Sequence, residues 1–207
     1  MASADDALVT LREMPTATIY EAAGKLGDMA PSIRLLTPGL RMAGSAFTVK
    51  TMPGDSLAVL RAIATAPAGS VLVIDGGGTD RSTVWGGTST IAAMVRGIAG
   101  LVTNGAIRDI DEIRSLGFPV FGAGLSLRGT VKAHPGWDRL PVSVGGVVVC
   151  PGDLVVGDSD GVVVVASARL ADVALRAVEQ KQLENARDLR IRAGADLREV
   201  LELPIAG

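Results

Sequence analysis

The sequence has very few residues of the types that build most metal and redox centres. Its 207 residues include one cysteine, Cys150, and one histidine, His134. A single cysteine excludes a disulfide within the chain and a cysteine-based zinc cluster, and a single histidine excludes a metal site with two or three histidine ligands. We expect Cys150, in the run VGGVVVC, to be a buried structural thiol. We expect His134, beside a proline turn, to be a loop or packing residue.

Aromatic residues and long apolar runs are also scarce. Only 3% of the residues are aromatic whereas 48% are hydrophobic, so the core must consist mainly of Val, Ile, Leu and Ala. No apolar run approaches the ~20 residues of a membrane span, and the acidic start MASADD has no apolar leader region. Lys and Arg are scattered and the net charge is −2, which argues against nucleic acid as a partner. We therefore expect a cytoplasmic protein without a membrane or nucleic-acid partner.

Glycine is abundant, at 26 residues, and separates apolar strands from helices. Strands are expected at 41–51, 70–75, 101–105 and 118–124, and helices at 15–27, 55–66, 86–100 and 109–117. Strands and helices that alternate through short glycine turns are typical of right-handed β-α-β crossovers. The sequence therefore predicts an α/β fold with a mainly parallel sheet.

Two C-terminal segments depart from this alternation. Between 140 and 166, three Val-rich runs are separated by Pro-Gly-Asp and Asp-Ser-Asp-Gly turns, a pattern that predicts a β-meander. Residues 168–194 are charged and contain no helix breaker before Gly194, which predicts a long C-terminal helix. The length fits one domain spanning 1–207.

The stretch WGGTST (85–90) stands at the start of a predicted helix. Gly86 and Gly87 leave backbone N–H groups uncovered there, and the partial positive charge of a helix N-terminus favours an anion. The alternative is a glycine-rich helix start that Thr88 or Ser89 caps.

Arg108 and Asp109 stand side by side in TNGAIRDIDEI, at the next junction from strand to helix. Because ligands of α/β sheets gather beyond the carboxyl ends of the strands, we expect this pair at the same sheet edge as Gly86 and Gly87. Asp109 either caps the helix that follows or ligates a divalent cation. Mg²⁺ and Mn²⁺ suit a single protein carboxylate because they keep several waters and accept a chelating substrate.

Taken together, these segments resemble the RraA-like family over roughly residues 15–200. The resemblance rests on Gly86-Gly87 followed 22 residues later by Arg108-Asp109, and on the run VSVGGVVVCPGDLVVGDSDGVVVV. The family includes the 4-hydroxy-4-methyl-2-oxoglutarate aldolases, class II pyruvate aldolases with oxaloacetate decarboxylase activity. The resemblance implies a layered β/β/α sandwich of the swivelling phosphohistidine-domain type with a long C-terminal helix. It also implies a homotrimer or hexamer in which that helix packs on a neighbouring subunit.

The resemblance further implies roles for the site residues. Asp109 would ligate the Mg²⁺ or Mn²⁺ ion directly, Arg108 would bind substrate and stabilise the enolate, and the backbone of residues 86–89 would bind the substrate carboxylate. Glu184, ten residues before Gly194, would orient a metal water from a neighbouring subunit; the alternative is a solvated face of a charged helix. The aldolases often carry an acid at the position of Gly87, which this chain lacks.

The implied reaction cleaves the C3–C4 bond of a 2-keto acid and releases pyruvate. One alternative is a non-catalytic regulator of the RraA type that binds RNase E. Such regulators lack the aspartate after the arginine and the long C-terminal helix, and this sequence has both Asp109 and residues 168–194. Another alternative is a family member that acts on a different keto acid.

Overall fold

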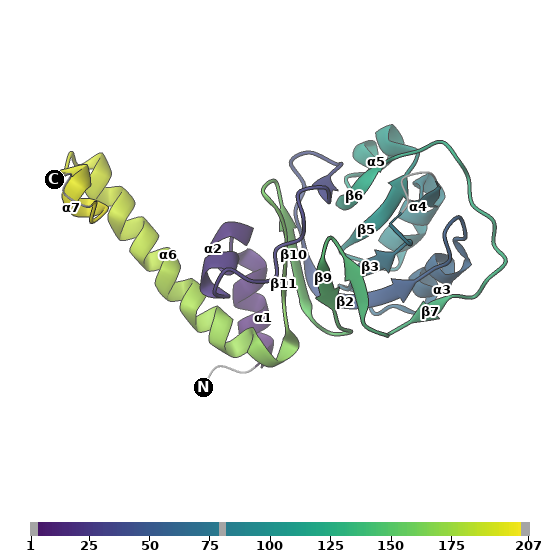
Figure 1. The fold of residues 1–207 in the computed structure, drawn as a ribbon, viewed down its shortest axis with the longest axis horizontal. Coiled ribbons are helices and arrows are strands. Elements are labelled where there is room, and N and C mark those ends of the chain that lie inside the picture. The colour runs from purple at the N-terminus through teal and green to yellow at the C-terminus, as the bar shows by residue number, and fades with distance from the viewer. Residues whose placement is uncertain (1–3, 79–81, 204–207) are drawn as a thin grey trace.

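A mixed sheet forms the centre of the computed structural model, which describes residues 4–78 and 82–203 (Figure 1). Its strands are β1 (Arg34–Leu35), β2 (Met42–Lys50), β3 (Val71–Asp75), β4 (Thr83–Trp85), β5 (Gly100–Ile107), β6 (Val120–Leu125), β7 (Trp137–Asp138), β10 (Leu154–Asp158) and β11 (Gly161–Val165). The order is β1-β6-β5-β3-β2-β10-β11, with β4 beside β5 and β7 beside β2. Strands β2 to β6 pair in parallel, whereas β1, β7, β10 and β11 add antiparallel edges.

Three helices cover one face of the parallel strands: α3 (Leu57–Thr65), α4 (Gly87–Val95) and α5 (Ile110–Leu116). Each connects two strands that pair in parallel, namely β2 to β3, β4 to β5 and β5 to β6. The helices bury small and branched residues such as Val59, Ala93 and Ile113 against Leu72 and Leu101 of the sheet. The predicted β-α-β crossovers are thus confirmed.

A separate hairpin covers the other face of the sheet. Strands β8 (Val142–Val144) and β9 (Val147–Val149) pack Val142 and Val144 against Val73, Val102 and Phe121. The predicted single meander is therefore wrong, because β8 and β9 form their own two-stranded sheet while β10 joins β2 and β11. A Val-rich pattern predicts buried strands, but it does not determine which strands pair with each other.

The outer face of β10 and β11 packs against α1 (Ala4–Glu13), α2 (Thr16–Ala22) and α6 (Leu170–Arg192). Leu154, Val156 and Val163 of the strands meet Leu11 of α1 and Val173 of α6. The predicted long C-terminal helix is confirmed, and a short 3₁₀ turn leads into it. Helix α1 and the short strand β4 were not predicted from the sequence.

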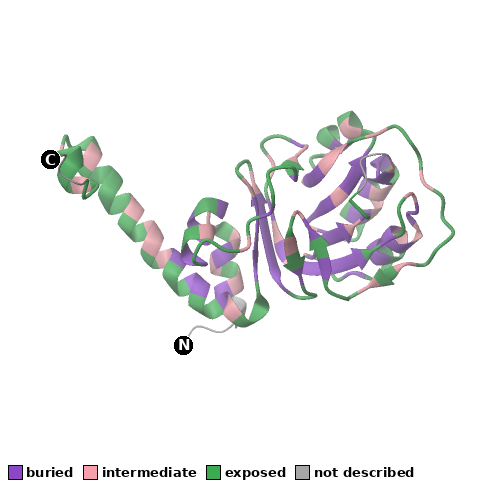
Figure 2. Ribbon diagram, viewed as in Figure 1, coloured by how far each residue is buried: buried purple, intermediate pink, exposed green. Residues whose placement is uncertain are grey.

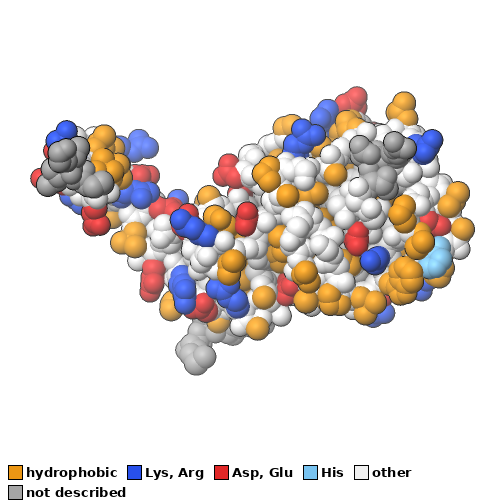
Figure 3. All heavy atoms as spheres, viewed as in Figure 1, with side chains coloured by type: hydrophobic (Ala, Val, Ile, Leu, Met, Phe, Trp, Pro, Cys, Tyr) orange, Lys and Arg blue, Asp and Glu red, His pale blue; other side chains and the backbone are white. Residues whose placement is uncertain are grey.

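Beyond Ala177, the last buried residue of α6, the helix passes α2 and extends away from the body as an arm that ends in α7 (Leu197–Val200) (Figure 1). Residues along this arm are mostly exposed (Figure 2), and Leu183 and Leu189 are each 68% exposed. Both hydrophobic and charged side chains lie on the visible face of the arm (Figure 3). Within residues 4–78 and 82–203, no helix combines the length and the apolar character that a membrane crossing requires.

The expectation that Cys150 is buried is wrong, because its side chain is exposed. Alternation along β9 directs Val149 into the core and Val148 outward, and Cys150 continues the outward face. The Cys150 amide donates to Asp153 Oδ2 at 2.8 Å, so the chain turns there.

Phe121→Ala is expected to lower the free energy of unfolding by about 3–5 kcal/mol, because it leaves a cavity in the core. The Phe121 ring is fully buried between the sheet and the β8–β9 hairpin. Urea unfolding followed by circular dichroism measures the change, with the exposed Val148→Ala as control. A loss below about 1 kcal/mol would contradict this packing.

Candidate functional site

The two motifs meet at one edge of the parallel sheet, as predicted. The Arg108 amide donates to the Trp85 carbonyl at 3.1 Å, which holds the β5–α5 junction beside the β4–α4 junction. The Gly87 amide then donates to Asp109 Oδ2 at 3.0 Å. Two segments 22 residues apart in the sequence are thereby joined through a single peptide N–H group.

Asp109 does not cap the helix that follows it. It occupies the N-cap position of α5, but its side chain makes no capping hydrogen bond and its backbone is left-handed, with φ 56° and ψ 34°. Such a conformation costs a non-glycine residue of the order of 1–3 kcal/mol and is found mainly where a site requires it. The capping interpretation is therefore wrong, because the carboxylate turns toward the start of α4.

The start of α4 is held rigidly by the indole of Trp85. Its Nε1 donates to Thr90 Oγ1 at 2.7 Å, the Thr90 hydroxyl donates to the Gly86 carbonyl at 3.1 Å, and the ring stacks on Phe118. Gly86 is the N-cap and no side chain caps the helix, so the proposed cap by Thr88 or Ser89 is also wrong. Of the first amides of α4, that of Gly87 donates to Asp109, and no side chain of α4 itself caps the others.

Glycine is required at position 86 because the Asp109 carboxylate lies against it. A Cβ on Gly86 would stand 2.7 Å from Asp109 Oδ2 and 3.2 Å from Arg108 Cγ. Any larger residue would push the carboxylate away from the Gly87 amide.

A pocket of about 300 Å³ opens at this junction. Its lining includes five of the residues predicted from sequence, namely Gly86, Thr88, Ser89, Arg108 and Asp109. It also includes Ser56, Thr130 and Lys132, which sequence reasoning missed. The pocket thus combines one carboxylate with two cationic side chains, several hydroxyl groups and a helix N-terminus.

Lys132 and Thr130 reach the pocket because Asp55 holds their loop. The buried Asp55 carboxylate accepts hydrogen bonds from the amides of Ala133 and His134, both at 2.8 Å, and from the Leu57 amide at 2.8 Å. From the sequence, Asp55 or Ser56 is expected only as the N-cap of α3. Its second oxygen binds a loop nearly 80 residues away, and no local pattern signals that contact.

The Asp55 carboxylate is stabilised in its charged form. Hydrogen bonds from the Leu57 and His134 amides outweigh burial and hold the pKa of Asp55 below its ordinary value. The loop is therefore anchored to an anion throughout the neutral range.

Arg108 and Asp109 form an ion pair at the mouth of the pocket. Arg108 Nε lies 3.4 Å from Asp109 Oδ2, and the two side chains are 48% and 42% exposed. This exposure leaves the guanidinium and the carboxylate accessible to a ligand. A guanidinium can bind a carboxylate or a developing oxyanion, and a carboxylate can bind a cation.

The donor set fits Mg²⁺ or Mn²⁺ better than zinc or calcium. No group of three or more His, Cys, Asp or Glu side chains assembles in the part of the chain that the structure describes. Zinc and calcium sites usually need such a group, whereas Mg²⁺ binds through one or two carboxylates and keeps several waters. Asp109 supplies a carboxylate of that kind.

Glu184 is not brought to this pocket within one chain. It lies on α6, where Oε2 accepts from Thr18 Oγ1 at 3.3 Å and pairs with Lys181 Nζ at 3.4 Å. Helix α6 and helices α4 and α5 stand at opposite ends of the molecule (Figure 1). A role for Glu184 in the site of a neighbouring subunit stays a prediction.

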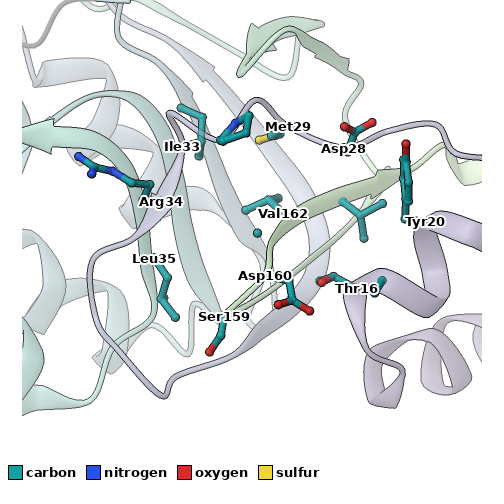
Figure 4. A pocket seen from close by; sticks show the side chains of 14 residues that line it. Thr16, Tyr20, Asp28, Met29, Ile33, Arg34, Leu35, Ser159, Asp160 and Val162 are labelled. Carbon is teal, nitrogen blue, oxygen red and sulfur yellow. The ribbon is translucent and has the colours of Figure 1, made fainter.

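A larger cavity, of about 560 Å³, lies between α2, the segment 28–35 and the turn from β10 to β11 (Figure 4). The Arg34 guanidinium is directed away from the Asp160 carboxylate, so the charged groups of its lining do not converge (Figure 4). Ligand sites usually converge a few polar groups on one point. The Arg108–Asp109 pocket therefore remains the better candidate.

A family model described as RraA-like, Aldolase/RraA, matches residues 16–164. The chain belongs to the RraA-like family. The resemblance seen in the sequence is confirmed, and the mixed α/β body with its long C-terminal helix is an RraA-like fold.

Relatives of this RraA-like chain differ in the functions that their names state. A Halalkalibacterium halodurans protein, provisionally named 4-hydroxy-4-methyl-2-oxoglutarate aldolase, is 37% identical over 90% of this chain and 89% of its own length. A solved structure of an uncharacterized Pseudomonas syringae protein superposes with a TM-score of 0.84 at 31% identity, covering 97% of this chain and 98% of that one. RraAS2 of Streptomyces coelicolor, described as an unusual member of the RNase ES inhibitor RraA family, reaches a TM-score of 0.81 at 29% identity, covering 88% and 96%.

Asp55→Asn is expected to lower the melting temperature at neutral pH, because an amide side chain cannot accept all three N–H groups that the carboxylate binds. Folding lowers the pKa of Asp55, so its contribution is complete above the ordinary value of 3.8 and is lost as the pH falls through the lowered value. Thermal melts across the acid range should show a constant difference from wild type above about pH 5 that shrinks below pH 3.8. A difference that persists unchanged at the lowest pH would contradict this anchor.

Proposed function

We propose that this RraA-like chain is a divalent-metal-dependent lyase that cleaves the C3–C4 bond of a 2-keto acid and releases pyruvate. It would act as a 4-hydroxy-4-methyl-2-oxoglutarate aldolase, an oxaloacetate decarboxylase, or both. The observation that carries the proposal is the convergence of Arg108, Asp109 and the start of α4 on one pocket. The name of the Halalkalibacterium relative supports the same substrate class.

Asp109 would hold the Mg²⁺ or Mn²⁺ ion. Oδ2 is engaged by the Gly87 amide and lies near Arg108, which orients the carboxylate. When bound, the cation would supply Lewis acidity to the C2 carbonyl of the substrate. The left-handed backbone of Asp109 keeps the carboxylate at the pocket rather than on α5.

The remaining groups of the pocket suit a keto acid. The amides of Thr88 and Ser89, in the first turn of α4, would receive the C1 carboxylate. The Arg108 guanidinium would stabilise the negative charge that develops on the C2 oxygen as the C3–C4 bond breaks. Lys132 adds a second cation to the lining, which suits a substrate with two carboxylates.

The proposal includes the quaternary arrangement that the family resemblance implies. A single domain over 1–207, built as a β/β/α sandwich of the swivelling phosphohistidine type, would assemble as a trimer or a hexamer. The exposed leucines of the α6 arm, Leu183 and Leu189, support a partner along that arm. Glu184, on the same arm, would then approach the pocket of the neighbouring subunit.

Pyruvate release should require both the cation and Asp109. With oxaloacetate or 4-hydroxy-4-methyl-2-oxoglutarate as substrate and Mg²⁺ present, we expect turnover that EDTA abolishes and added Mn²⁺ restores. Asp109→Asn should lower kcat/KM by at least about 10²-fold, because it removes the carboxylate that would hold the cation. A coupled lactate dehydrogenase assay measures the rate, and indifference to both EDTA and Asp109→Asn would refute lyase chemistry.

Arg108→Ala should lower kcat by about 10²–10³-fold, the scale found for single groups that stabilise a developing oxyanion. Arg108→Lys should recover only part of this loss, because an ammonium cannot reproduce the planar guanidinium fork. Arg96→Ala removes an exposed arginine at the end of α4 and serves as the control. Equal kcat values for the Arg96 and Arg108 alanine variants would show that Arg108 takes no part in the reaction.

A regulator that binds RNase E is the second candidate function. The likeness to RraAS2 favours it, because that structure covers 88% of this chain and its description places it in the RNase ES inhibitor family. The two functions separate in one comparison. Capture of this chain by the scaffold region of RNase E, without metal-dependent release of pyruvate, would favour the regulator.

A further inference from the structure

The Glu112 carboxylate lies directly over the α-carbon of Gly87. A Cβ built on Gly87 would overlap Glu112 Oε2 and stand 2.7 Å from Glu112 Cδ. Real Cβ atoms essentially never come so close to another atom. A side chain at position 87 and the observed position of Glu112 therefore exclude each other.

Glu112 lies there although the sequence offers it another partner. Asp109 and Glu112 have the spacing of a capping box, in which the glutamate would return to the N-cap amide. No capping bond forms at α5, and the exposed Glu112 carboxylate has no hydrogen-bond or ion-pair partner among residues 4–78 and 82–203. The Asp109 and Glu112 carboxylates thus both lie at the start of α4.

We propose that Glu112 is a positioning residue that supplies the second carboxylate of the cation site, in the space that a side chain at position 87 would fill. This inference rests on the proposed function. Gly87 makes both contacts possible, since its amide binds Asp109 and its bare α-carbon makes room for Glu112. Mg²⁺ and Mn²⁺ favour one or two carboxylates and keep several waters, to which a second carboxylate can hydrogen-bond.

The competing explanation is that Glu112 only complements the helix dipole of α5. Asp111 provides the matched control for that explanation. It stands beside Glu112 in the same first turn, but its side chain is 95% exposed and pairs with Arg114 at 3.3 Å. A dipole effect would make the two acids interchangeable, whereas a cation site would depend on Glu112 alone.

The first experiment measures Mn²⁺ binding to the full-length protein by calorimetry and electron paramagnetic resonance, without substrate. Glu112→Gln should weaken Mn²⁺ binding by about 10–100-fold. This is the range found for residues that hydrogen-bond to the ligands of a metal. Asp111→Asn should change binding by less than about 2-fold. Equal affinities for these two variants would overturn the proposal.

The Asp109→Asn variant separates this proposal from the function on which it rests. If Asp109→Asn loses Mn²⁺ binding and Glu112→Gln does not, the lyase proposal stands and the role of Glu112 fails. If Asp109→Asn binds Mn²⁺ as wild type does, the metal-dependent function itself fails.

The second experiment tests whether Gly87 and Glu112 act as one unit. Gly87→Ala should displace the Glu112 carboxylate and weaken Mn²⁺ binding as Glu112→Gln does, and the double variant should show no further loss. Gly87→Asp placed in the Glu112→Gln background should restore binding. Two results would refute the coupling of Gly87 and Glu112. One is a loss of Mn²⁺ affinity in the double variant that equals the sum of the single losses. The other is no recovery of Mn²⁺ binding by Gly87→Asp in the Glu112→Gln background, in a protein that melts at the wild-type temperature.

Discussion

The hydrogen bond from the Gly87 amide to Asp109 Oδ2, at 3.0 Å, is the contact on which the site depends. Together with the hydrogen bond from the Arg108 amide to the Trp85 carbonyl, it joins the β4–α4 and β5–α5 junctions. An N–H group at a helix start has no partner within its helix, and a carboxylate is the strongest acceptor that it can find. This contact keeps Arg108, the Asp109 carboxylate and the first amides of α4 next to one another.

The contact requires an unusual backbone at Asp109. A right-handed or extended residue at that position would place its carboxylate on the N-terminus of α5, as an ordinary cap. The left-handed conformation, with φ 56°, directs it to α4 instead. A hydrogen bond to a charged acceptor contributes about 1.5–3 kcal/mol, which is comparable with the ~1–3 kcal/mol that the conformation costs. The strain is therefore offset locally, and the carboxylate keeps an exposed face for a ligand.

Sequence patterns predicted the crossovers and the meeting of residues 86–89 with Arg108 and Asp109, because both follow from strand order in a parallel sheet. The sequence patterns failed at residues whose side chains contact a segment distant in sequence instead of, or as well as, their own helix. Asp109 and Glu112 match a capping box, and Asp55 matches a helix cap. Asp109 and Asp55 nevertheless accept hydrogen bonds from other segments, and Glu112 lies against Gly87 of α4. Lys132 could not be found for the same reason, since its loop is placed by the second oxygen of Asp55. Strand β4 has three residues, too few for a periodic signal.

Charge balance links the proposed parts of the site. Arg108 and Lys132 carry two positive charges, and Asp109 and Glu112 carry two negative ones, so the side chains alone are neutral. A divalent cation together with a dicarboxylate substrate adds two charges of each sign and keeps the assembly neutral. Partly closed pockets tolerate charges only when these are paired. With Asp109 alone, the proposed site would hold the same cation and substrate with one uncompensated positive charge. The Glu112 carboxylate beside Gly87 would offset that charge.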